Sequence, residues 1–137
     1  MQVWDYPKAL ATGALVLALN LATLVAIIFG YSAIDPGHPP EFYSEAAPRV
    51  GAYSGPIAGA LLMLIFVWLL SSRKPRRNAY AFAATTFASY AALDIALGLA
   101  AAPASDLFRM PFVLSLGGVC IAALAAAFLA SSRKRNA

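Results

Sequence analysis

The sequence predicts an all-α integral membrane protein, a bundle of four transmembrane helices with both the N and C termini in the cytoplasm. Hydrophobic residues make up 61% of the 137 residues and charged residues only 12%, whereas a soluble domain carries about 25% charged residues. The chain also divides into four apolar runs, each of about the 20 residues that a bilayer crossing needs. Its length fits a single domain.

Each apolar run is bounded by polar, basic or proline-containing residues. The predicted spans are residues 9–31, 51–70, 79–102 and 110–130, with an outer loop at 32–50 and a basic tail at 131–137. In the outer loop we expect a short surface helix over residues 40–47, which Pro48 ends because proline removes a helical hydrogen bond. Short turns join the second span to the third and the third to the fourth, so these pairs should be antiparallel neighbours.

The orientation follows from the basic residues, since Lys and Arg in short loops favour the cytoplasmic side. With four spans and both termini inside, only Arg49 and Arg109 lie outside. The other basic residues are cytoplasmic: Lys8, Arg73, Lys74, Arg76, Arg77, Arg133, Lys134 and Arg135. Short loops and an alanine-rich composition suit a multi-pass protein of a bacterial inner membrane.

The third span carries the sharpest chemical signal, a carboxylate inside an apolar run. Residues three and four apart share a helix face, so Asp94 shares a polar stripe with Tyr90, Ser89 and Thr86. Such a stripe faces other helices or a wet cavity rather than lipid. Asn20, near the middle of the first span, is a second intramembrane polar residue.

Asp94 has two interpretations. In the functional one it binds a proton or a cation, and its charge is neutralised according to state. In the structural one its carboxyl hydrogen-bonds Asn20, Tyr90 or a backbone carbonyl and fixes the helix register. We favour the structural role at this point, because a transport pathway usually needs more than one ionisable group.

A short motif recurs after the second and fourth spans. Residues 71–74 and 131–134 both read Ser-Ser-Arg-Lys, and Arg-Asn-Ala follows in both places. This pattern predicts two tandem helical hairpins of the same topology. The alternative is that two cytoplasmic helix ends share a common composition.

Three glycines open the second span at intervals of four residues: Gly51, Gly55 and Gly59. Glycine at this spacing clears one helix face for close approach of another helix. The glycine row therefore predicts helix packing, either within the bundle or against another protein or copy. Pro56 in the same region predicts a kink.

The outer loop holds the remaining candidates, His38, Glu41, Glu45 and Arg49. Two carboxylates and an imidazole can bind zinc or iron, but the spacing lacks the helical HExxH pattern, and an ordinary solvated loop is the alternative. Cys120 is the sole cysteine, which excludes an internal disulfide and a multi-cysteine metal site. We predict no metal and no cofactor.

No phosphate loop, nucleophile elbow, CxxC or dinucleotide fingerprint is present in the sequence. The leading hypothesis is a non-catalytic membrane protein that acts by helix–helix association, either as an accessory subunit of a membrane complex or as a homo-oligomer. Its expected partners are the lipid bilayer and another membrane protein or itself, but not nucleic acid. One alternative is a small proton- or cation-coupled transporter centred on Asp94. The other is an outer-face enzyme or metal site using His38, Glu41 and Glu45.

Overall fold

The computed structural model describes residues 3–74, 77–101 and 110–135, and it confirms an all-helical chain with four helices that are long and apolar enough to cross a membrane. The described part contains no strand. The helices are α1 (Asp5–Ile34), α2 (Pro40–Ser72), α3 (Ala79–Ala101) and α5 (Met110–Arg135).

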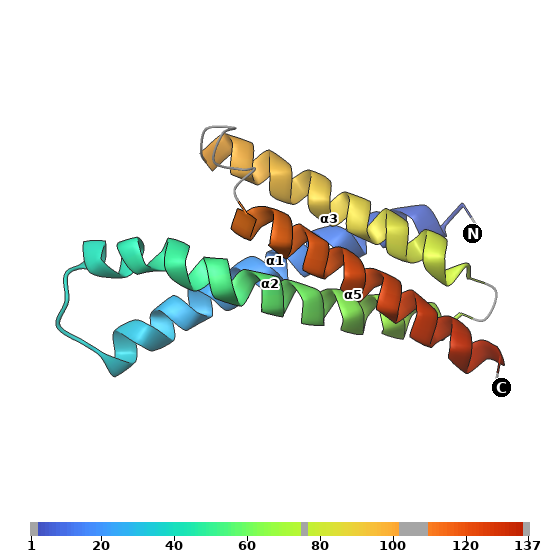
Figure 1. The fold of residues 1–137 in the computed structure, drawn as a ribbon, viewed down its shortest axis with the longest axis horizontal. Coiled ribbons are helices and arrows are strands. Elements are labelled where there is room, and N and C mark those ends of the chain that lie inside the picture. The colour runs from blue at the N-terminus through green and yellow to red at the C-terminus, as the bar shows by residue number, and fades with distance from the viewer. Residues whose placement is uncertain (1–2, 75–76, 102–109, 136–137) are drawn as a thin grey trace.

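The four helices run roughly lengthwise, with the start of α1 and the end of α5 at the same end (Figure 1). We call this the terminal end, and the opposite end, where residues 35–39 join α1 to α2, the hairpin end. At the hairpin end α1 and α2 extend well beyond α3 and α5 (Figure 1). The bundle therefore has four helices along part of its length and two along the rest.

The packing partners differ in part from those expected. α5 packs against both α2 and α3, and α1 packs against both α2 and α3. The predicted α3–α5 neighbours are therefore confirmed, whereas α2 and α3 touch only sparsely despite their short connection. α1 occupies the place beside α3 because Gly13 lets the two backbones approach closely.

The expected helix end at Pro48 is wrong, because α2 begins at Pro40 and continues through both Pro48 and Pro56. The outer loop therefore shortens to residues 35–39. Pro48 frees the carbonyl of Ser44, one turn earlier. Ser44 is exposed at the hairpin end, where solvent can satisfy that carbonyl.

The other boundaries move by shorter distances. α1 starts at Asp5 rather than at residue 9, and α5 continues to Arg135 through most of the predicted basic tail. α3 ends at Ala101, one residue short of the predicted boundary. The connection predicted between the third and fourth spans, with Arg109, lies outside the described residues.

The buried core fills only the terminal half of the bundle. Along α1 the last buried residue is Leu17, and along α3 it is Tyr90. Along α2 and α5, which run the other way, the first buried residues are Gly59 and Val119. The terminal half is therefore closely packed, and the hairpin half is more open.

Candidate functional site

A cavity of about 270 Å³ lies between the four helices, just beyond the edge of the buried core, and we call it the polar cavity because Asn20 and Asp94 line it. Each helix contributes one residue about a turn past its last buried position: Asn20 on α1, Gly55 on α2, Asp94 on α3 and Ser115 on α5. The remaining described lining is mainly apolar: Leu21, Leu24, Gly51, Ala52, Pro56, Tyr90, Pro111 and Phe112. The core thus ends in a ring of polar groups and glycine.

The base of this cavity is fixed by a hydrogen bond between α1 and α3. The side-chain Nδ2 of Asn20 donates to the Tyr90 hydroxyl at 3.1 Å. A Cβ atom added at Gly59 would lie 3.1 Å from that hydroxyl and 3.3 Å from Asn20 Nδ2. Gly59 therefore makes the space in which these two polar side chains meet.

Asp94 is the only charged residue among the described residues that line the cavity. It is partly buried, one helical turn from Tyr90. Within the part of the chain that the structure describes, its carboxylate has no hydrogen bond or ion pair. The structure pairs Asn20 with Tyr90 instead, so the carboxylate stays available to a ligand in the cavity.

The other members of the polar stripe lie toward the terminal end, and their hydroxyls hydrogen-bond to helix backbone carbonyls. Thr86 is fully buried and donates from its hydroxyl to the backbone carbonyl of Phe82 at 2.8 Å. Ser89 donates to the carbonyl of Leu10 on α1 at 2.9 Å. Thr86 and Ser89 are absent from the described cavity lining.

The three glycines of α2 have unequal surroundings. Gly59 is buried, and a Cβ there would meet Val119 at 3.3 Å as well as the polar pair. A Cβ at Gly51 would make ordinary contacts with Leu24 at 3.6 and 3.7 Å, whereas one at Gly55 would meet nothing within 4 Å. The glycine row therefore faces the interior of this bundle and the cavity.

A very close contact between α1 and α3 involves Gly13, which no spacing pattern in the sequence marks. A Cβ at this position would lie 2.5 Å from the backbone oxygen of Thr86 and 2.8 Å from Ser89 Cβ. Only a glycine allows this approach, because no real Cβ makes contacts so short. Gly13 thereby holds α3 in the position from which Tyr90 reaches Asn20.

A second, apolar hollow of about 810 Å³ lies between α2 and the start of α5. We call it the lateral groove. Its described lining consists of Pro48, Arg49, Ala52, Tyr53, Pro56, Met110, Pro111 and Leu114. Ala52, Pro56 and Pro111 line the polar cavity as well, so the two hollows share a wall.

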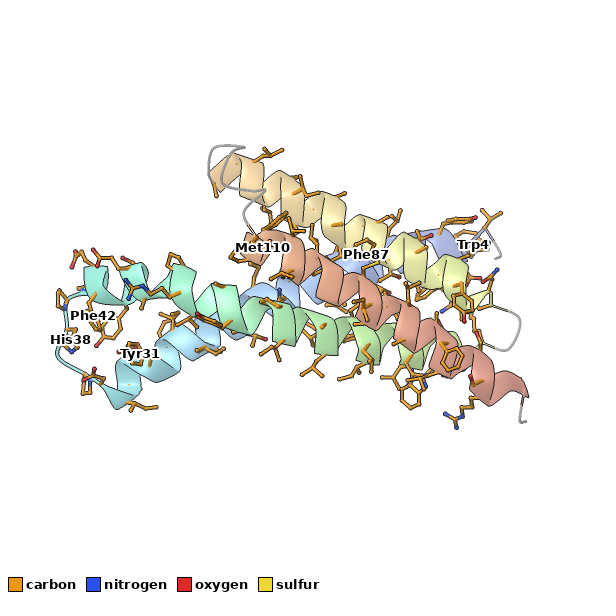
Figure 2. The ribbon with its side chains drawn as sticks, in the orientation of Figure 1. Trp4, Tyr31, His38, Phe42, Phe87 and Met110 are labelled. Carbon is orange, nitrogen blue, oxygen red and sulfur yellow. The ribbon has the colours of Figure 1, made fainter. Side chains whose placement is uncertain are left out.

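The outer-loop candidates do not converge on one site. His38 Nε2 lies 3.4 Å from Asp35 Oδ2, and the imidazole stacks on Phe42 with 4.2 Å between ring centroids. Figure 2 shows His38 and Phe42 together at the tip of the hairpin. Glu41 and Glu45 are exposed, and the described residues contain no group of three His, Cys, Asp or Glu that could hold a metal ion. Arg49 instead lines the lateral groove.

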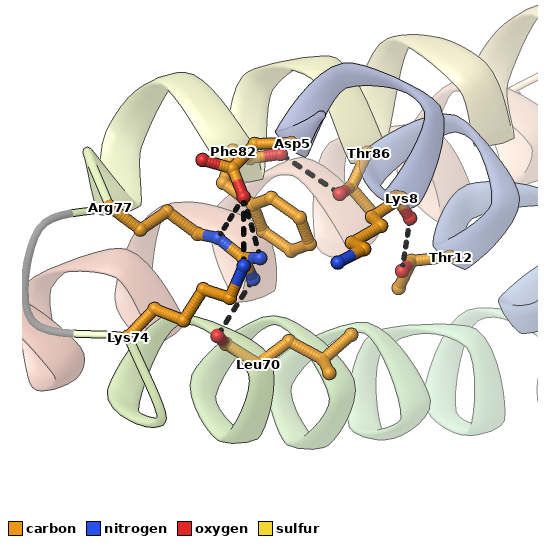
Figure 3. A network of polar contacts seen from close by, with 8 residues as sticks. All are labelled: Asp5, Lys8, Thr12, Leu70, Lys74, Arg77, Phe82 and Thr86. Carbon is orange, nitrogen blue, oxygen red and sulfur yellow. Dashed lines mark hydrogen bonds and ion pairs between the residues drawn. The ribbon is translucent and has the colours of Figure 1, made fainter. Parts of the chain in front are cut away.

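A buried ion pair at the terminal end was not predicted from the sequence. Arg77 donates to Asp5 Oδ1 from Nε at 3.0 Å and from Nη2 at 2.7 Å, and its Nη1 donates to the Leu70 carbonyl at 2.8 Å (Figure 3). Lys74 Nζ lies 3.9 Å from the same carboxylate oxygen. The Arg77 guanidinium also lies 4.4 Å above the Phe82 ring. These contacts tie the start of α1 to the end of α2 and the start of α3.

Comparison with other proteins assigns nothing further to this chain. No family model matches it, and no curated protein or solved structure matches it.

Proposed function

We propose that this chain is a small multi-pass membrane protein that binds a proton or a cation at Asp94 and carries it across the membrane. The observation that carries the proposal is the position of Asp94 in a cavity to which all four helices contribute. Among the described lining residues no cationic side chain neutralises the carboxylate. A bare carboxylate at this depth is costly, so a bound proton or cation would stabilise it.

The other polar groups of the cavity favour a positively charged ligand. Asn20 uses its Nδ2 to donate to Tyr90, which leaves its Oδ1 as an acceptor. That oxygen is buried and has no hydrogen-bond partner among the described residues. The carboxylate of Asp94 is an acceptor that no described side chain hydrogen-bonds, and a cation or a protonated group supplies the partner that it lacks.

The difference between the two halves of the bundle supports a carrier. In our orientation the terminal end is cytoplasmic, because most of the basic residues lie there. The terminal half is closed by the apolar core and by the Asp5–Arg77 pair, while the polar cavity lies in the more open hairpin half. This asymmetry fits a state in which the site is accessible from the outside. Transport then requires the helices of the terminal half to separate.

Flux in reconstituted liposomes tests the proposal. Liposomes with pyranine inside report proton movement after an imposed pH step, with potassium and valinomycin to prevent a voltage from building up. We expect wild-type protein to accelerate the pH change and Asp94→Asn to return it to the protein-free rate. Glu45→Gln serves as a matched control, because Glu45 is an exposed acid outside the cavity.

Circular dichroism and gel filtration of both variants establish that the bundle remains folded. Asp94→Asn liposomes that match the wild type in proton flux, and also in flux of sodium or potassium, would remove Asp94 from any carrier mechanism. A wild type with no flux of these ions above empty liposomes would remove the proton- and metal-cation version.

Helix–helix association is the second candidate. Within the most apolar window of each helix, only 17% to 28% of the residues are buried inside this chain. Most of each span is therefore available to lipid, to another copy or to another membrane protein. The space beside Gly59 is already filled by Tyr90, Asn20 and Val119 of this chain. The glycine row therefore offers another protein a poorer packing surface than its spacing predicted.

The mass of the protein in lipid nanodiscs tests association directly. A homo-oligomer predicts that mass photometry or native mass spectrometry gives a multiple of the 14.3 kDa chain at low protein-to-lipid ratio. A strictly monomeric chain that copurifies with no other membrane protein would exclude this candidate. The flux assay is independent of that result.

A further inference from the structure

We infer that the cation taken by the Asp94 site is a lipophilic organic cation, which lies across the lateral groove and the polar cavity with its positive charge toward Asp94. This inference rests on the proposed function and specifies its substrate class. Two adjoining hollows carry it. One contains a carboxylate, and the other is lined mainly by apolar residues.

The two hollows are adjacent because they share wall residues. Ala52 and Pro56 of α2 and Pro111 of α5 line both. The short side chain of Ala52 and the two prolines, which donate no backbone hydrogen bond, form an apolar boundary between them. A molecule that lies across this boundary meets carbon on one side and the carboxylate of Asp94 on the other.

Charge sets the orientation of such a molecule. Arg49 is the charged residue in the described lining of the lateral groove, and Asp94 is the charged residue in that of the polar cavity. A positive centre is repelled by Arg49 and attracted by Asp94, so it belongs in the polar cavity.

The volumes of the two hollows suit an organic molecule that occupies both. Pockets for small organic molecules measure about 300–1,000 Å³. The polar cavity, at about 270 Å³, is large enough for a cationic centre but falls below this range. The lateral groove, at about 810 Å³, has room for the rest of an organic molecule.

The lateral groove is also open to the surroundings of the bundle. Tyr53 is 79% exposed, Met110 71% and Leu114 64%, and all three line it. When the helices span a bilayer, this opening lies along the flank of α2 and α5 close to the outer surface, because Arg49 and Met110 stand at the outer ends of the second and fourth predicted spans. A lipophilic cation held at that surface can therefore enter the groove from the side.

Tetraphenylphosphonium is a suitable probe, because it is permanently charged and apolar on all sides. Tetraphenylborate is the matched control, since it has the same shape with the opposite charge. Binding of both is measured by equilibrium dialysis against the full chain in nanodiscs, with empty nanodiscs subtracted. We expect saturable binding of tetraphenylphosphonium alone, weakened about tenfold or more in Asp94→Asn.

Two neighbouring substitutions on α5 separate the groove from the cavity. Leu114→Trp fills the groove but not the polar cavity, which Leu114 does not line, and Val113→Trp adds the same bulk at an exposed position outside both described linings. We expect Leu114→Trp to weaken tetraphenylphosphonium binding about tenfold while the Asp94-dependent proton flux persists. Val113→Trp should match the wild type in both assays.

Each outcome bears on a different claim. Proton flux that depends on Asp94, without saturable tetraphenylphosphonium binding, overturns the organic substrate and leaves the proposed function standing. Equal binding by wild type and Asp94→Asn, or equal binding of the borate, overturns it too. If Leu114→Trp has no effect on binding, the lateral groove is not part of the site. Absence of both flux and binding removes this inference together with the proposed function.

Discussion

Arg77 Nη2 lies 2.7 Å from Asp5 Oδ1, and the two residues are only 6% and 2% exposed although 72 positions separate them in the chain. A buried charge that loses its partner destabilises a fold by about 3–5 kcal/mol. We therefore expect Asp5→Asn and Arg77→Gln each to lower the free energy of unfolding by about this amount. Unfolding in mixed detergent micelles, followed by circular dichroism, measures it.

The double variant Asp5→Asn, Arg77→Gln closes a thermodynamic cycle and should lose much less than the sum of the single variants. Arg73→Gln is the control, because Arg73 is exposed close to the same connection, and its effect should stay within about 0.5 kcal/mol. Fully additive single effects would show that the two side chains do not stabilise one another.

A methyl group at Gly13 tests the approach of α1 to α3. Gly13→Ala puts a Cβ 2.5 Å from the Thr86 backbone oxygen, so the helices must separate. Overpacking of this kind costs about 1–3 kcal/mol. Gly30→Ala, on the same helix with nothing within 4 Å, should instead be neutral or stabilising, since alanine favours helix by about 0.5–1 kcal/mol. Thermal unfolding of both variants in one detergent gives the comparison.

Replacing the Asp94 carboxylate by an apolar group separates its functional and structural roles. If Asp94 serves to bind a ligand rather than to stabilise the fold, Asp94→Leu should leave the free energy of unfolding unchanged or raise it, by up to about 3 kcal/mol on membrane insertion scales. Asp94→Asn provides the polar comparison of similar size. A bundle that tolerates asparagine but unfolds with leucine would identify Asp94 as a structural hydrogen-bonding residue, and the carrier would lose its basis.

The orientation of the bundle can be tested with the single cysteine removed. In a Cys120→Ser background, Glu41→Cys near the hairpin end and Arg73→Cys near the terminal end are both exposed positions. A maleimide that cannot cross membranes should label Glu41→Cys in intact cells, and Arg73→Cys only after the membrane is opened. The reverse pattern would invert the bundle and place the polar cavity on the cytoplasmic side.

The helical architecture could be predicted from the sequence because bilayer-length apolar runs leave few alternatives. Spacing alone also placed Tyr90 and Asp94 on one face of α3, and both line the polar cavity. The partner of Asn20 could not be chosen, because the choice between Tyr90 and Asp94 depends on how α1 lies against α3. Gly13 decides that placement, and a lone glycine in an alanine-rich run carries no recognisable spacing.

The ion pair could not be predicted from the sequence for a different reason. Eight basic residues are predicted on the same side of the membrane as Asp5, and nothing in the sequence selects one of them as its partner. Arg77 is selected by its place directly before α3, which brings it over Phe82 and toward α1. The helix end predicted at Pro48 was wrong because a proline near an exposed helix end disrupts the helix less than a proline in a buried segment does.

The unequal helix lengths have a consequence for the lipid environment. α1 and α2 contain 30 and 33 residues, against 23 in α3, and at 1.5 Å per residue the longer pair spans about 45–50 Å and α3 about 35 Å. The hydrocarbon layer is about 30 Å thick, and long helices adapt to it by tilting. Thinner bilayers would tilt α1 and α2 more than α3. This changes the angle between α3 and the α1–α2 pair beside the polar cavity, which Asn20 and Asp94 both line. Acyl-chain length then becomes a physical control on ligand access.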